Sequence, residues 1–171
     1  MTRTRRPWTR RNTAVAGWSA AVFLGALCPS RLLAQSRSLP VLPPETKPVL
    51  KALERARYAV FLAPPPIQGA YGATDVKRRL IWVAPIAIEL GIARQVLLHE
   101  AVHAAQGCPK GKLTPLGWSI NVDHVVDREI SALLFRGYAH GKHDVEREAF
   151  MAQGHPRAIP MVVEALRQRC R

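Results

Sequence analysis

Residues 97–106, "LLHEAVHAAQ", decide both the fold and the chemistry expected of this chain. His99 and His103 are four residues apart, and Glu100 directly follows the first histidine. On an α-helix, residues i and i+4 lie about 40° apart around the axis, so the two imidazoles can converge on one metal ion. Glu100 lies about 60° from His103 and can reach a water there without binding the ion. Apolar neighbours on both sides predict a buried helix with one polar seam.

A third metal ligand must come from elsewhere, because catalytic zinc sites hold three protein ligands and keep one position open. The segment "VEREAF" at 145–150 offers Glu146 and Glu148. These glutamates lie about 200° apart on a helix, so only one of them can face the metal. The small residues Ala149 and Ala152 would let this helix approach the HExxH helix closely. Other side chains that could serve as the third ligand are Glu129, His124, His140, His143 and His155.

"HEAVH" followed downstream by "EREA" resembles the gluzincin branch of the zincin metallopeptidases, in which a glutamate on a later helix, often as E-x-x-A, completes the site. The resemblance implies Zn²⁺ as cofactor and Glu100 as the catalytic general base. The implied metal ligands are His99, His103 and Glu146, with Glu148 as the alternative. The segments "LLHEAVHAAQGCP" and "EREAFMAQGHP", with a cysteine near the C-terminus, are also similar to small exported HExxH proteins of cyanobacteria, of unassigned function, over residues 80–171.

The chain departs from the gluzincin pattern in the residues that support the metal ligands. Many gluzincins carry an aspartate four residues after the ligand glutamate, where this chain has Phe150. Metal sites depend on outer partners, the side chains that hydrogen-bond to the ring nitrogen of each histidine that does not face the metal. The sequence therefore does not assign the outer partners of His99 and His103. Possible substitutes are Asp123, Asp127 and Asp144. Candidates for stabilising developing negative charge on a substrate are Tyr138, His140 and His143.

Two functional hypotheses follow from the motif and the resemblance. The first is a zinc-dependent hydrolase, chiefly a peptidase, that acts on a peptide or protein substrate. The alternative is a non-catalytic metal-binding or interaction module on a zincin-like scaffold. It is kept because no residue is assigned as an outer partner of the histidines or as a group that stabilises negative charge on a substrate.

The basic charge does not indicate nucleic-acid binding. The formal net charge is +13, but the first 34 residues contribute six arginines and no acid. The remainder carries 19 Lys and Arg against 12 Asp and Glu. These are not interleaved with aromatic residues that could stack on bases. No nucleic-acid partner is expected.

The N-terminal residues have the organisation of an export signal. A cationic stretch, "MTRTRRPWTRR", precedes the uncharged "TAVAGWSAAVFLGALC", and Ala34 is a small residue suited to cleavage. We predict a signal peptide or N-terminal anchor over 1–34, a Pro-rich linker over 35–48 and a zincin-like metal-binding domain over 49–171. The protein is expected to be exported, to the periplasm, the thylakoid lumen or the cell exterior. Membrane contact is expected only through an uncleaved N-terminal segment.

The three cysteines of the chain are relevant to the expected export. Cys28 falls within the predicted leader, which leaves Cys108 and Cys170 as an even pair. In an exported domain such a pair favours a disulfide. The alternatives are two free thiols, or Cys108 as an additional metal ligand.

The rest of the chain predicts an α+β fold, mostly α: a zincin-like helical domain with a small β-hairpin before the HExxH helix. The hairpin is expected from the Gly-rich segment 67–75 and the run "LIWV" at 80–83. The predicted helices cover 49–63, 86–107, 118–139, 144–155 and 161–170. Asp144 is expected as an N-cap. The residues expected on the buried side of the helix over 118–139 are Val122, Val126, Ile130, Leu133 and Leu134.

Overall fold

The structure, a computed structural model, describes residues 41–137 and 142–171. They belong to one unit, Ser38–Arg171, and no helix among them is long and apolar enough to cross a membrane. The predicted leader, 1–34, lies outside the described residues. The elements are η1 (Pro44–Thr46), α1 (Lys47–Arg55), β1 (Ala59–Leu62), β2 (Gly72–Asp75), β3 (Leu80–Val83), α2 (Ile86–Glu89), α3 (Ala93–Gly107), α4 (His124–Gly137), α5 (His143–Gln153) and α6 (Ala158–Arg169). The predicted α+β class with mainly helical structure is confirmed.

The three strands form one mixed sheet in the order β1–β3–β2. β2 and β3 are antiparallel and form the predicted hairpin, whereas β1 runs parallel to β3. β1 was not expected, because 49–63 was predicted as one helix. That prediction is wrong beyond Arg55: Arg57 has a φ of 61°, outside the helical region. The β-branched and aromatic residues that follow then pair with β3.

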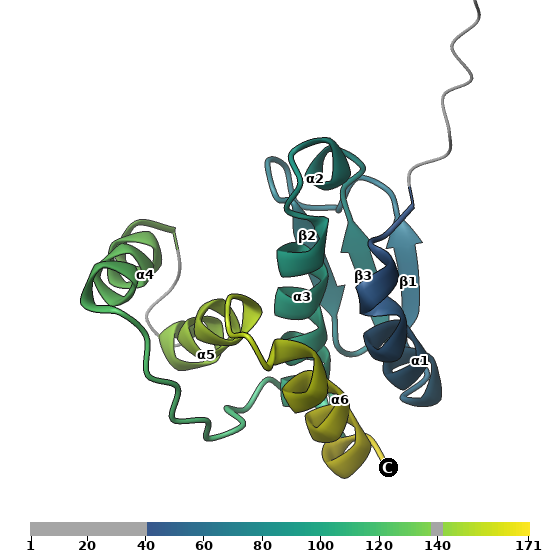
Figure 1. The fold of residues 1–171 in the computed structure, drawn as a ribbon. Coiled ribbons are helices and arrows are strands. Elements are labelled where there is room, and N and C mark those ends of the chain that lie inside the picture. The colour runs from purple at the N-terminus through teal and green to yellow at the C-terminus, as the bar shows by residue number, and fades with distance from the viewer. Residues whose placement is uncertain (1–40, 138–141) are drawn as a thin grey trace, which may run out of the picture. The chain divides into compact units, whose positions relative to one another are not determined.

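Helix α3, which carries the HExxH motif, lies between the sheet and helices α5 and α6 (Figure 1). It is buried over most of its length, as predicted. Ala149 and Ala152 on α5 are fully buried, which is consistent with a close approach of α5 to α3. The single helix predicted over 86–107 is wrong, since Gly91 adopts a φ of 70° and separates α2 from α3.

Three predicted helices after α3 are present with shifted boundaries. The helix predicted over 118–139 begins only at His124. Of its predicted buried face, Ile130 and Leu134 are buried, but Val126 and Leu133 are 46% and 51% exposed, because α4 packs mainly on α5. Val122 precedes the helix and is half-buried.

The N-termini of the last two helices also differ from the prediction. Lys142, not Asp144, occupies the N-cap of α5, and Asp144 lies in the first turn. Helix α6 begins at Ala158, three residues before the predicted start. Pro160 is accommodated because the first helical turn needs no N–H donor at that point.

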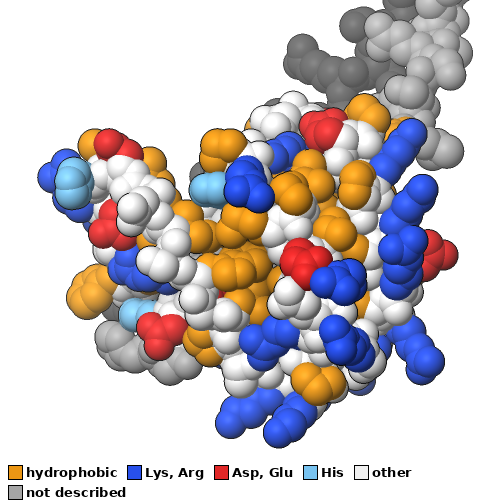
Figure 2. Space-filling view, turned by 60° about the horizontal axis from the view of Figure 1, so that its bottom comes forward, with side chains coloured by type: hydrophobic (Ala, Val, Ile, Leu, Met, Phe, Trp, Pro, Cys, Tyr) orange, Lys and Arg blue, Asp and Glu red, His pale blue; other side chains and the backbone are white. Residues whose placement is uncertain are grey.

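Cys108 and Cys170 form the predicted disulfide. It joins the residue after α3 to the residue after α6, across a sequence separation of 62. Such a bond is consistent with an oxidising, exported location. Figure 2 shows one face of the molecule, on which apolar side chains gather centrally and Lys and Arg lie mainly around them.

Candidate metal centre

His99, His103 and Glu146 come together where α5 crosses α3. Their ligand atoms all lie within 4.8 Å of one another, and all three residues are buried. The Nε2 atoms of the two histidines are 3.1 Å apart. Glu146 Oε2 lies 3.3 Å from His99 Nε2 and 3.2 Å from His103 Nε2. Within the described residues, this is the group of three side chains arranged to hold a metal ion.

The donor set fits a zinc ion. Two imidazole nitrogens and one carboxylate oxygen are ligands that zinc takes at about 2.0–2.2 Å. Ligands at that distance in a tetrahedron are about 3.4 Å apart, close to the separations found here. The three atoms all bear lone pairs, so they repel one another unless a cation or proton lies among them.

Glu146 and His103 shift each other's pKa. Burial raises the pKa of Glu146, but hydrogen bonds from His103 and His99 outweigh it and lower the pKa to about 2. Burial lowers the pKa of His103, yet its hydrogen bond to Glu146 and the charges of Glu146 and Glu100 raise it above the usual value. The metal-free centre therefore favours an ionised carboxylate beside a protonated imidazole.

Both histidines have an outer partner that the sequence did not reveal, and each partner is a glutamine. His103 Nδ1 donates to Gln106 Oε1 at 2.8 Å, and His99 Nδ1 donates to Gln153 Oε1 at 3.1 Å. The Phe150 ring, at the position where gluzincins carry aspartate, packs edge-on against His99 with ring centroids 4.6 Å apart. Helical spacing could have indicated both glutamines. Gln153 is seven residues after Glu146 and Gln106 is three after His103, so each lies on the same helix face as a ligand.

Glu148, the alternative third ligand, faces away from the metal group. Its Oε2 accepts from Leu116 N at 2.7 Å and from Gln106 Nε2 at 2.8 Å. Its Oε1 accepts from Gly117 N and Trp118 N at 2.7 and 2.9 Å. The 200° separation on the helix thus sends one glutamate to the histidines and the other to the loop before α4.

Glu100 lies beside the metal group but outside it. Its Oε2 accepts a hydrogen bond of 2.8 Å from the Thr74 hydroxyl on β2. The same hydroxyl is 3.1 Å from the backbone oxygen of Glu100. Gly72 leaves room for this carboxylate, since a Cβ there would lie 2.6 Å from Glu100 Oε1. Strand β2 therefore fixes where the glutamate side chain lies.

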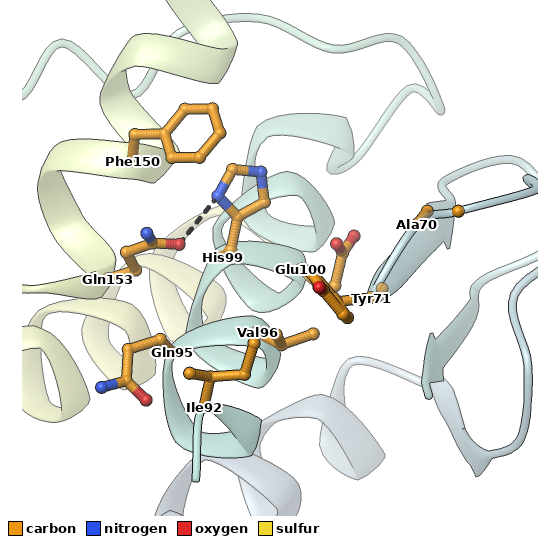
Figure 3. A pocket seen from close by; sticks show the side chains of 11 residues that line it. Ala70, Tyr71, Ile92, Gln95, Val96, His99, Glu100, Phe150 and Gln153 are labelled. Atoms are coloured by element: carbon orange, nitrogen blue, oxygen red, sulfur yellow. Dashed lines mark hydrogen bonds between the residues drawn. The ribbon is translucent and has the colours of Figure 1, made fainter. Parts of the chain in front are cut away.

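A cavity of about 440 Å³ reaches His99 and Glu100 from the outside. Figure 3 shows Phe150 and Gln153 of α5 on one side, with Ala70 and Tyr71 on the other and Glu100 between them. His103 and Glu146 do not line it. The remaining lining residues are Gly69, Gly72, Ile92, Gln95 and Val96.

The other candidates proposed from sequence lie outside this group. His155 accepts from Arg157 N, and Asp123 accepts from Val125 N. Asp127 pairs with Arg147 at 2.6 Å. Tyr138 and His140 are outside the described residues. The candidates His124, Glu129, His143 and Asp144 are on α4 or α5, and none belongs to the metal group.

Comparisons with protein-family models, with curated proteins and with solved structures found no match. The resemblance to gluzincins therefore remains a prediction from the sequence motif.

Proposed function

We propose that this chain is a zinc-dependent hydrolase, chiefly a peptidase, on a zincin-like scaffold. The observation that carries the proposal is the position of Glu100. Its carboxylate lines the cavity beside His99 while the three candidate ligands converge without it. A carboxylate that is adjacent to a metal group and outside its ligand set is what a general base requires.

In this proposal His99, His103 and Glu146 hold the ion. Bound zinc would acidify a water molecule and polarise a substrate carbonyl. Glu100 would accept a proton from the attacking water and return it to the leaving amine. The Thr74 hydroxyl holds the Glu100 carboxylate toward β2, and buried surroundings strengthen each of these interactions.

A peptide or protein is the proposed substrate class. The resemblance of the motif to gluzincins supports this choice. So does the mixed lining of the cavity, in which apolar side chains such as Ile92, Val96 and Phe150 surround the polar pair His99 and Glu100. The disulfide and the predicted leader over 1–34 support an exported site of action.

A non-catalytic metal-binding module is the second candidate. It is favoured by one observation, namely that His103 and Glu146 do not line the cavity, so that access to the ion would pass His99 alone. In that case the centre would bind zinc and stabilise the fold without turnover.

The experiment that separates the two functions uses protein secreted into an oxidising compartment and loaded with zinc. Hydrolysis of an unfolded protein substrate is followed with and without a zinc chelator. Glu100→Gln should keep stoichiometric zinc and lose activity by about 10²- to 10⁴-fold, the usual contribution of a general base. If the unaltered protein binds zinc but does not hydrolyse the substrate, the non-catalytic module is the function that remains. Activity that survives Glu100→Gln would exclude the assigned mechanism.

A further inference from the structure

Gln106 and Glu148 are buried polar residues that are outside the metal group and do not line the cavity next to it. Gln106 is 0% exposed and Glu148 is 6% exposed. Both side chains are hydrogen-bonded to residues of other segments, and Gln106 also to His103 of its own helix. These hydrogen bonds restrict which atoms can donate and which can accept.

The direction of the Gln106 amide is fixed by its two acceptors. Gln106 Nε2 donates to Val145 O at 2.9 Å and to Glu148 Oε2 at 2.8 Å. A carbonyl and a carboxylate can only accept, so the amide nitrogen must face them. Gln106 Oε1 then faces His103 Nδ1 at 2.8 Å.

That direction determines the tautomer of His103. Because Gln106 Oε1 can only accept, Nδ1 of the neutral imidazole must carry the proton. The lone pair is then on Nε2, the atom that meets His99 and Glu146. A flipped amide would place NH₂ against Nδ1 and would move the proton to Nε2, where it would block metal binding.

Glu148 in turn is held by the loop before α4. Three successive backbone N–H groups, of Leu116, Gly117 and Trp118, point at its carboxylate. Gly117 has a φ of 82°, a conformation that lets neighbouring N–H groups converge on one anion. With the Gln106 amide as a fourth donor, the carboxylate has no freedom to turn.

We propose that Glu148 is a positioning residue for the metal centre: through Gln106 it fixes His103 as the Nδ1–H tautomer and so supports zinc affinity. The inference rests on the metal site of the proposed function, but not on catalysis. It also assigns a role to the glutamate that is not among the converging ligands.

The critical variant is Glu148→Gln. One end of the new amide must present NH₂ to a donor. On the Oε1 side it would meet two backbone N–H groups, which cannot reverse, whereas on the Oε2 side it would meet one and the Gln106 amide, which can. The NH₂ end should therefore face Gln106 and drive the Gln106 amide to flip. The Nε2–H tautomer of His103 should then become populated, and zinc affinity should fall about 10- to 100-fold, as when other outer partners of metal ligands are lost.

The double variant Gln106→Glu with Glu148→Gln is the rescue. The carboxylate introduced at position 106 can accept both from the amide introduced at position 148 and from His103 Nδ1–H, so the Nδ1–H tautomer should return. Zinc affinity should recover in part, because Val145 O loses its donor in this variant. Gln168→Glu is the matched control, because Gln168 also donates to a glutamate, Glu164, but on the exposed surface. It should leave both readouts unchanged.

Two readouts are measured: the zinc dissociation constant by chelator competition, and the His103 tautomer by ¹⁵N NMR of metal-free protein at a pH where the imidazole is neutral. A Nε2–H tautomer in the unaltered protein would overturn the proposal, and this needs no variant to fold. So would Glu148→Gln with unchanged tautomer and zinc affinity within about twofold, far short of the expected loss. If Glu148→Gln does not fold, Gln106→Leu is measured in its place and must lose the Nδ1–H preference. Absence of zinc binding by the unaltered protein would instead count against the proposed function. The tautomer of His103 would then still test whether Glu148 acts on it through Gln106.

Discussion

The Thr74 hydroxyl on β2 donates to the Glu100 carboxylate at 2.8 Å, and so ties an edge strand of the sheet to the motif helix α3. The two residues are 26 positions apart in sequence. Glu100 is only 7% exposed, so its carboxylate depends on a protein donor for part of its solvation. This bond holds the proposed base away from the three ligand atoms and at the wall of the cavity.

Thr74→Val should therefore lower the catalytic rate without releasing zinc. The valine keeps the shape of the side chain but removes the donor, so that Glu100 loses its fixed orientation. We expect kcat to fall about tenfold, part of the roughly 10²–10⁴ that a general base contributes. Stoichiometric zinc and an unchanged zinc dissociation constant should accompany the loss.

Thr46→Val is the matched control, because Thr46 is also buried and donates to Pro43 O, just before η1 and away from the metal group. It should cost about 1 kcal/mol of stability and leave kcat unchanged. Equal rates in both variants would show that Thr74 does not orient the base.

Gly72→Ala should impair the proposed base by a steric route. The added Cβ would lie 2.6 Å from Glu100 Oε1 and 2.7 Å from Val96 Cγ1, closer than real contacts allow. Either the glutamate or the strand must move, and we expect kcat to fall at least about tenfold. Gly137→Ala, whose Cβ would meet nothing within 4 Å, should leave kcat unchanged. Full activity of Gly72→Ala would mean that Glu100 is free to relocate.

Local patterns were enough to predict the helix that carries the motif, though not its start at Ala93, and also the β2–β3 hairpin and the disulfide. Each is decided mainly by periodicity, turn residues or compartment. Helix geometry predicted that only one of Glu146 and Glu148 faces the histidines, and the resemblance to the gluzincin E-x-x-A pattern favoured Glu146. Strand β1 was missed, since its pairing with β3 comes from a tertiary contact that outweighs the helical spacing of Tyr58 and Val60.

The outer partners of the histidines could not be read from composition. The sequence suggests aspartates, because carboxylates commonly support metal-bound histidines, whereas the chain uses the amides of Gln106 and Gln153. An amide becomes recognisable as such a partner only when its neighbours are known, here Val145 and Glu148. Tertiary contacts, not residue type, determine the direction of its oxygen.

Glu146→Ala and Glu148→Ala should fail in different ways. Loss of Glu146 removes a ligand, so zinc content should fall well below stoichiometric while the fold persists. Loss of Glu148 leaves three backbone N–H groups without their acceptor and should cost about 3 kcal/mol or more of stability. All three ligands remain, so zinc supplied in excess should still bind stoichiometrically, although with lower affinity. Zinc content by elemental analysis and denaturant unfolding separate the two. Glu164→Ala, on the exposed face of α6, is the control; equal zinc retention by all three variants would remove Glu146 as a ligand.

Reduction of the Cys108–Cys170 bond should destabilise the protein by about 4 kcal/mol in the chain-entropy model for a loop of 62 residues. The bond restrains the unfolded chain, so the urea midpoint should fall on addition of a reductant. The variant with Cys108→Ser and Cys170→Ser should start at that lower midpoint and show no further response. Two reactive thiols from this pair in the native, unreduced protein would contradict the assignment.

The metal-free and zinc-loaded proteins should respond oppositely to pH. The lowered pKa of Glu146, about 2, gives a stabilisation that is present above its ordinary value of 4.5 and is lost as the pH falls toward 2. The raised pKa of His103 gives a stabilisation that is complete below 6.5 and is lost as the pH rises through the raised value. Metal-free protein should thus gain most from this pair between about 4.5 and 6.5.

Zinc competes with the proton on His103, so its affinity should rise over the range in which the metal-free protein loses this stabilisation. The difference in Tm between zinc-loaded and metal-free protein should therefore widen as the pH increases from about 5 to about 9. Thermal unfolding at a series of pH values, with and without zinc, measures it. His155→Ala, outside the metal group, should reproduce the widening, whereas Glu146→Gln should abolish it. A Tm difference independent of pH would show that zinc binding does not displace a proton from this centre.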